Sequence, residues 1–185
     1  MPGTARPVVI VGDPVLHTPT AAVTEFDEAR ATLIEDMFAT LYVAEGVGLA
    51  ATQIGVGLSV FVYDCHDAEG VQHRGHLVNP RIVATSKDEE KIDEGCLSVP
   101  GPYAPLARPF EVTVAGQDRH GEPLRVTGTG FLARCLIHET EHLNGTLYID
   151  HLNRRRRNRI LQEIEPFDWN APLFEPLEPF EPQPS

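Results

Sequence analysis

The chain of 185 residues is long enough to form one domain with a hydrophobic core and is short for two. Its 42% hydrophobic and 23% charged residues are ordinary for a globular protein and exclude a wholly disordered or fibrous one. The formal net charge of -12 excludes a chain that wraps nucleic acid along its whole surface, because phosphates would repel it.

The sequence also indicates in which cellular compartment the protein is expected. No apolar run reaches the roughly 20 residues that a membrane-spanning helix requires, and residues 1–11 lack the build of a signal peptide. Cys65, Cys96 and Cys135 are an odd number of cysteines at wide spacing, which favours free thiols in a reducing compartment. We therefore expect a cytoplasmic protein without membrane association.

The first predicted element is a helix over 26–44, and Gly46 and Gly48 are expected to end it. Its apolar residues are spaced by one, three and four positions and so share one face: Leu33, Ile34, Met37, Phe38 and Leu41. Short stretches rich in β-branched and aromatic residues then predict antiparallel strands over 58–63, 77–83, 110–115 and 124–127.

A second helix is predicted over 130–144, with Thr129 as its N-cap and Gly145 as a left-handed cap past its end. Beyond Asn153 an arginine-rich stretch is followed by many Pro and Glu residues, which oppose regular structure. The segregated elements indicate an α+β fold, with antiparallel sheets packed around the second helix. We predict a catalytic domain over 1–152 and a basic, then Pro/Glu-rich tail over 153–185.

The second helix carries the pattern H-E-x-x-H at residues 138–142. A step of four residues points His138 and His142 toward one ion, and Glu139 can then reach water bound to that ion. The same five residues can also occur on a surface helix by chance. Catalytic zinc-type sites use three protein ligands, so the identity of a third ligand decides between these interpretations.

Several residues are candidates for the third ligand. Metzincin peptidases place a histidine where this chain has Tyr148, and no methionine follows the helix. A thermolysin-like glutamate would have to be Glu163 or Glu165, beyond the arginines, and His151 lies in a run that also fits a strand. Cys96 follows a glycine that allows close backbone approach, and it would complete a Cys-His-His set. Taken alone, however, a free cysteine is more commonly a small buried hydrophobic residue.

Three segments together resemble the peptide deformylase family, and they occur in that family's order. They are Gly-Val-Gly-Leu-Ala-Ala-Thr-Gln at 46–53, Glu-Gly-Cys-Leu-Ser at 94–98 and His-Glu-Thr-Glu-His-Leu at 138–143. The likeness extends from about Val8 to about Leu152. It implies a hydrolase that removes the N-formyl group from the formylmethionine of nascent polypeptides and releases formate, an N-terminal processing step of protein biosynthesis.

The resemblance also implies roles for individual residues. Cys96, His138 and His142 would bind a divalent metal, typically Fe(2+), with Zn(2+), Ni(2+) or Co(2+) able to use the same ligands. Glu139 would be the general acid and base, and Gln53 and the backbone amide of Leu97 would stabilise the oxyanion. An extended formylmethionyl peptide would lie beside Gly46, Val47, Gly48 and Leu49, with Cys135 near the methionine pocket or simply packed in the core.

These roles agree with general chemistry. A dication held by one thiolate and two imidazoles stays positive and lowers the pKa of bound water toward about 7. A positioned amide donor such as Gln53 is worth roughly a hundredfold in rate, and Glu139 on the order of 10² to 10⁴. A peptidase using the same helix, or a deformylase-like binding module without turnover, remains an alternative.

The chain departs from the family pattern at Ile137 and Glu141, where Gln and Asp are usual. Both residues, with Arg134, are expected on a helix face turned away from the two histidines. The usual aspartate pairs with an arginine that corresponds to Arg108, and we expect the longer Glu141 still to reach it. The cluster Arg154, Arg155, Arg156 and Arg157 is either a solvated helix face or a contact with the ribosome.

Overall fold

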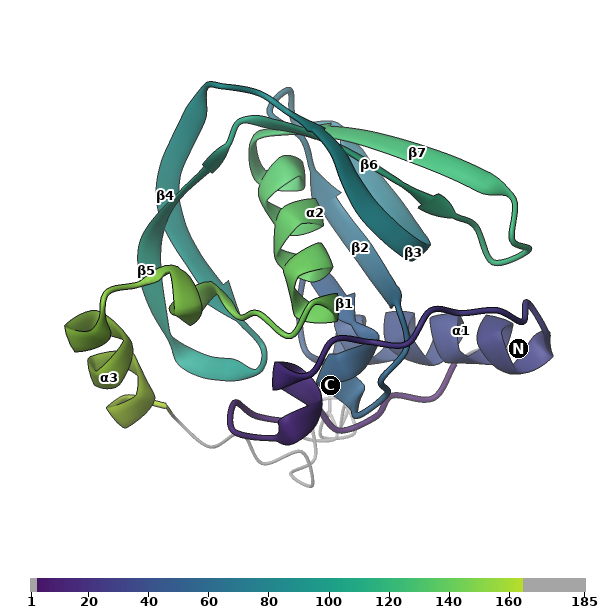
Figure 1. The fold of residues 1–185 in the computed structure, drawn as a ribbon, viewed down its shortest axis with the longest axis horizontal. Helices are drawn as coiled ribbons and strands as arrows, with labels where there is room; N and C mark the ends of the chain where they lie inside the picture. Colours follow the sequence, from purple (N-terminus) through teal and green to yellow (C-terminus); the bar gives the residue numbers. More distant parts are fainter. Residues whose placement is uncertain (1–2, 165–185) are drawn as a thin grey trace, which may run out of the picture.

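The computed structural model describes residues 3–164 of the chain (Figure 1). Its elements, with η for short 3-10 helices, are η1 (Pro14–His17), α1 (Glu28–Val43), β1 (Gly48–Ala50), η2 (Ala51–Ile54), β2 (Val60–His66), β3 (Gln72–Thr85), β4 (Glu89–Cys96), β5 (Val99–Pro109), β6 (Glu111–Gln117), β7 (Pro123–Thr129), α2 (Gly130–Leu143), η3 (Tyr148–His151) and α3 (Arg154–Gln162). All the predicted helices and strands have counterparts among these elements.

The strands form two antiparallel sheets on either side of α2. A five-stranded sheet has the order β1-β2-β3-β6-β7, and β4 and β5 form a separate two-stranded sheet. Figure 1 shows α2 at the centre, with the β4–β5 hairpin on one side and the larger sheet on the other. This arrangement confirms the predicted α+β fold with a central helix.

Strand β2 of the larger sheet is buried on both faces, and its side chains alternate between two apolar clusters. On β2, Val60 and Val62 join the apolar cluster of α1, whereas Phe61 and Tyr63 join that of α2. A third cluster lies beneath β5 and includes Leu16, Tyr148 and Ile160. Helix α2 therefore packs on one face of the larger sheet and α1 on the other.

Helix α2 begins and ends close to the predicted positions. Thr129 occupies the N-cap position but makes no capping bond, and its hydroxyl instead accepts a hydrogen bond from the amide of Ala68 at 3.3 Å. Gly145 has a φ of +76°, as expected for a left-handed residue just past the end. Nearly all of the helix is buried, so its polar residues face the protein rather than water.

Helix α1 ends at Val43, before the two glycines that were expected to end it. The amide of Glu45 donates to the carbonyl of Tyr42 at 3.2 Å, and the amide of Gly46 donates to that of Leu41 at 2.9 Å. This pair of bonds is a Schellman motif. Its left-handed position is filled by Glu45, with a φ of +53°, instead of the usual glycine.

Three strands were not predicted from the sequence. Strand β1 is only three residues long, and β4 consists mainly of charged residues. Strand β5 contains several prolines, which lack an amide donor, and a two-stranded sheet tolerates them because each strand has a free edge. Local composition therefore concealed the hairpin that carries Cys96.

The arginine-rich start of the predicted tail is helix α3. Its Ile160 is 4% exposed and packs in the cluster beneath β5, so this part of the tail contacts the domain. The domain boundary at 152 and 153 remains a prediction, and the Pro/Glu-rich part from 165 onward lies outside the described residues. Within residues 3–164, no helix is long and apolar enough to cross a membrane.

Candidate functional site

Three side chains that could hold a metal ion, Cys96, His138 and His142, converge where the end of β4 lies beside α2. The Sγ atom of Cys96 lies 3.2 Å from Nε2 of His142, which lies 3.2 Å from Nε2 of His138. One donor atom from each residue lies within 4.8 Å of the other two. The step of four residues on α2 aligns the imidazoles, and the β4–β5 hairpin brings the thiol to them from another layer.

This donor set fits a divalent metal. One sulfur and two imidazole nitrogens are the ligands that first-row ions such as zinc and iron accept in proteins. The histidines are 8% and 0% exposed, so water does not compete for most of their surface, and His138 and Cys96 both line an open cavity. Three protein donors therefore lie beside a cavity through which a substrate could reach them.

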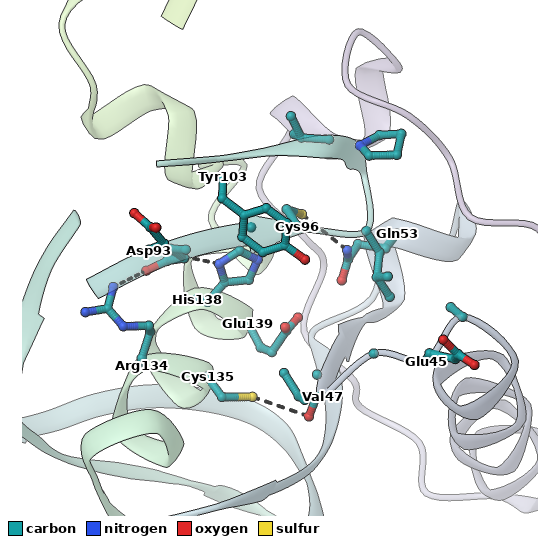
Figure 2. Close-up of a pocket in the computed structure, with 18 of the residues that line it drawn as sticks. Glu45, Val47, Gln53, Asp93, Cys96, Tyr103, Arg134, Cys135, His138 and Glu139 are labelled. Carbon is teal, nitrogen blue, oxygen red and sulfur yellow. Dashed lines mark hydrogen bonds and ion pairs between the residues drawn. The ribbon is translucent and has the colours of Figure 1, made fainter. Parts of the chain in front are cut away.

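Glu139 lies beside these donors and faces the same cavity (Figure 2). Its side chain is buried, and Oε2 has no hydrogen-bond partner among the described residues. Burial away from water raises the pKa of this carboxyl group to about 7. A buried carboxyl oxygen without a hydrogen-bond partner destabilises the fold. Such groups are typical of functional positions.

Gly48 in β1 leaves the space that Glu139 occupies. A Cβ atom at this glycine would contact Oε1 of Glu139 and would lie 2.7 Å from Sγ of Cys135. Real Cβ atoms do not approach other atoms so closely, so any side chain here would displace the carboxyl group. Glycine is therefore required at 48 because Glu139 and Cys135 leave no space for a Cβ atom.

We expect Gly48→Ala to lower kcat/KM by roughly a hundredfold, because displacement of a reacting group by about 1 Å can cost that much. The bound metal should be retained, since no ligand is touched. Formate release and metal content would be measured in the same sample. Gly57→Ala is the matched control, because a Cβ there meets nothing within 4 Å. Equal activity of Gly48→Ala and the parent would contradict this account of the glycine.

Gln53 in η2 is oriented by its neighbours. Its Oε1 accepts a hydrogen bond from the amide of Ala50 at 2.8 Å, and because a backbone amide can only donate, Nε2 must face the other way. Nε2 donates to Oγ of Ser98 at 3.3 Å and lies 3.6 Å from Sγ of Cys96. The Gln53 amide is therefore a fixed donor beside Cys96, as Figure 2 shows.

A cavity of about 370 Å³ opens onto these groups between β1 and the β4–β5 hairpin. Its walls include most of the residues expected to bind substrate, Gly46, Val47, Gly48 and Cys135, and the two expected to stabilise the oxyanion, Gln53 and Leu97. Cys135 both packs in the core and lines the cavity, where its thiol donates to the carbonyl of Val47 at 3.5 Å. The side chain of Leu49 is fully buried against α1, so any contact with substrate would come from its main chain, and that contact stays a prediction.

A buried group of charged side chains contacts His138 on the side of its Nδ1 atom. Nδ1 of His138 lies 2.8 Å from Oε1 of Glu94, whose two oxygens also accept hydrogen bonds from Arg108 and Arg134 at 2.8 to 3.0 Å. Burial alone would raise the pKa of Glu94, but the bonds with His138 and Arg108 hold it well below its usual range. Glu94 therefore stays ionised and orients the imidazole.

The expected pair of Glu141 and Arg108 is confirmed. Nη1 and Nη2 of Arg108 donate to the two Glu141 oxygens at 2.7 and 2.9 Å. Arg134 lines the same cavity as His138 and bonds directly to Glu94, whereas Glu141 is linked to Glu94 through Arg108. Through Glu94 both are connected to His138. In the sequence, Glu94 was noted only as part of the motif around Cys96. No local pattern identified Arg134 as its hydrogen-bond partner.

The other candidate ligands lie elsewhere. Nε2 of His151 is 2.9 Å from Oε2 of Glu141, and Glu163 pairs with Arg159. Tyr148 packs its ring against His138 at a centroid distance of 6.3 Å, and its hydroxyl donates to the carbonyl of Pro102 at 2.9 Å. Glu165 lies outside the described residues. Among the described candidates, Cys96 alone meets the two histidines.

A metal-binding set on an H-E-x-x-H helix, with a buried glutamate beside it, defines a metal-dependent hydrolase. The family model described as polypeptide deformylase matches residues 5–158. The chain therefore belongs to the polypeptide deformylase family, and the predicted resemblance, enzyme class and activity are confirmed.

Individual relatives agree with this assignment. Peptide deformylase 1 of Streptomyces avermitilis is 54% identical over 165 residues, which cover 88% of this chain and 76% of that protein. Peptide deformylase 2 of Streptomyces coelicolor is 49% identical, with 91% and 94% covered. A crystal structure of peptide deformylase from Ehrlichia chaffeensis superposes with a TM-score of 0.82 at 32% identity, with 87% and 95% covered.

Proposed function

We propose that this chain removes the N-formyl group from the formylmethionine of nascent polypeptides and releases it as formate. The observation that carries this proposal is the cavity between β1 and β5, which leads to the three donors and the buried Glu139. An extended chain end fits such a groove better than a folded surface would. Family membership supports the choice of a formyl amide over an internal peptide bond.

The roles of the residues follow from their positions. Cys96, His138 and His142 would hold the metal, which supplies Lewis acidity to activate water and polarise the formyl group. Nε2 of Gln53 and the backbone amide of Leu97 would donate to the formyl oxygen as it gains negative charge. Glu139 would accept a proton from the attacking water and deliver it to the leaving amine as the C–N bond breaks.

The substrate backbone is proposed to lie along β1. This strand is at the edge of the five-stranded sheet, with β2 on one side only, so its other edge can pair with an added strand. The main chains of Gly46, Val47, Gly48 and Leu49 would provide this edge. The methionine side chain would contact Cys135 and Phe131, which both line the cavity.

We infer that the metal is Fe(2+), although Zn(2+), Ni(2+) or Co(2+) fits the same donors. In an anaerobic assay, formyl-Met-Ala-Ser should yield formate while Met-Ala-Ser remains intact, and iron should be found in the same sample. Air should inactivate the iron form, whereas the nickel or cobalt form should persist. Cleavage of Met-Ala-Ser would favour a peptidase, and an air-stable iron form would contradict the proposed metal.

We also propose that α3 contacts the ribosome and that the protein works in the cytoplasm, where nascent chains emerge. Arg154, Arg155 and Arg156 are exposed, while Arg157 pairs with Asp150 at 3.1 Å. A dense positive charge on an acidic protein suits an RNA-rich partner. The unpaired cysteines of the described chain support a reducing compartment.

Changing Arg154, Arg155 and Arg156 together to Glu should weaken co-sedimentation with ribosomes, most clearly at low salt, because fewer phosphates would be neutralised. Turnover of a free formyl peptide should not change. Reversing three exposed charges elsewhere, at Arg81, Lys87 and Arg125, is the matched control. If both triple variants sediment like the parent, α3 is a solvated helix face.

A further inference from the structure

We propose that His151 is a positioning residue for the metal site, acting through Glu141, Arg108 and Glu94 on the ligand His138. The inference rests on the proposed metal-binding role of Cys96, His138 and His142. His151 itself is the last residue of η3 and does not touch any of the three donors. Its effect must therefore pass through a chain of hydrogen bonds.

The first link joins His151 to Glu141 at the protein surface. Nε2 of His151 lies 2.9 Å from Oε2 of Glu141, and the two side chains are 37% and 20% exposed. A carboxylate can only accept, so Nε2 must carry the hydrogen of this bond. The same nitrogen lies 3.5 Å from Nη1 of Arg108, which is also a donor, so this second contact is not a hydrogen bond.

The second link is the guanidinium group of Arg108, which lies between two carboxylates. It donates to both oxygens of Glu141 and, through Nε and Nη2, to both oxygens of Glu94 at 3.0 and 2.8 Å. The group is planar and rigid, so its orientation toward one carboxylate determines its orientation toward the other. Movement of Glu141 must therefore move Glu94 or break one of these bonds.

The third link reaches the metal ligand. Oε1 of Glu94 lies 2.8 Å from Nδ1 of His138, whose other nitrogen faces Cys96 and His142. The hydrogen bond at one imidazole nitrogen sets the orientation of the other toward a metal. The chain from His151 to His138 is thus continuous at hydrogen-bonding distance.

His151 matters because, without it, Arg108 would be the only described side chain that holds the Glu141 carboxylate. Among the described residues, the Glu141 carboxylate has only Arg108 and His151 as partners. The Glu141 side chain is 20% exposed, so water competes for its oxygens. The two carboxylates of this network, Glu94 and Glu141, are matched in charge by Arg108 and Arg134, so the part left to His151 is the extra hydrogen bond that restrains Glu141.

The test compares donors at position 151. Purified enzyme loaded with cobalt would be mixed with excess chelator, and the rate of metal loss would be followed with its visible absorption spectrum. His151→Ala and His151→Leu should lose metal about tenfold faster, the low end of the 10–100-fold range for groups that support a ligand. The visible absorption band of cobalt bound to these two variants should also shift. His151→Gln, which keeps an N–H donor, should resemble the parent.

His120→Ala is the matched control, because His120 is an exposed histidine in the turn between β6 and β7. A second arm combines His151→Leu with Glu141→Ala. If His151 acts through Glu141, the double variant should release metal no faster than Glu141→Ala alone. Full additivity of the two changes would overturn the proposed path.

The proposal is overturned if His151→Ala and His151→Leu match the parent in metal release and spectrum, or if His151→Gln behaves like them. Because these readouts need no turnover, they are separate from the deformylase activity. A parent that retains metal but releases no formate would refute the proposed function alone. A parent that cannot retain cobalt would refute both the metal site and the role of His151.

Discussion

Cys96→Ala, His138→Ala and His142→Ala are each expected to lose the bound metal and formate release together. Each residue supplies one of three donors, and three protein ligands are the usual complement of a catalytic site of this kind. The loss of activity should exceed the roughly 10–100-fold that follows loss of a supporting hydrogen bond. Metal content and formate release would be measured on the same anaerobic preparation.

Cys65→Ala is the matched control for the cysteine variant. Cys65 is 1% exposed and packs in the apolar cluster of α2, outside the three donors. It should retain metal and activity, with at most a modest loss of stability from the smaller side chain. If Cys96→Ala kept its metal and its rate, a different third ligand would have to replace the thiol.

Glu139→Gln is expected to keep the metal but to lower kcat by 10² to 10⁴, the usual contribution of a positioned acid or base. This range corresponds to about 3–5 kcal/mol of transition-state stabilisation. Glutamine has the same shape but cannot accept and return a proton. The change should be well tolerated, because Oε2 of Glu139 has no hydrogen-bond partner in residues 3–164 that glutamine would lose.

The measurement again pairs metal content with formate release. Glu69→Gln, an exposed change in the turn between β2 and β3, serves as the control and should leave both unchanged. A Glu139→Gln protein that contains no metal would show that Glu139 helps to hold the ion. A protein with metal and full activity would show that another group moves the proton.

The sequence by itself determined the parts that depend on neighbouring residues. The spacing of apolar side chains predicted α1. Thr129 and Gly145 marked the ends of α2, the latter because a left-handed residue favours glycine. The step of four between His138 and His142 predicted that their imidazoles would lie together. The order of three motifs identified the family, and it also led to the pairing of Glu141 with Arg108.

The tertiary structure decided which distant residues meet. Strands β4 and β5 have charged and proline-rich sequences, and their pairing depends on backbone contacts that residue spacing does not reveal. That hairpin brings Cys96 to His142, 46 residues away along the chain, and Glu94 to His138. The same packing turned the side chain of Leu49 into the core. Local periodicity shows which face a side chain occupies, whereas convergence on one ion depends on how sheets and helix pack together.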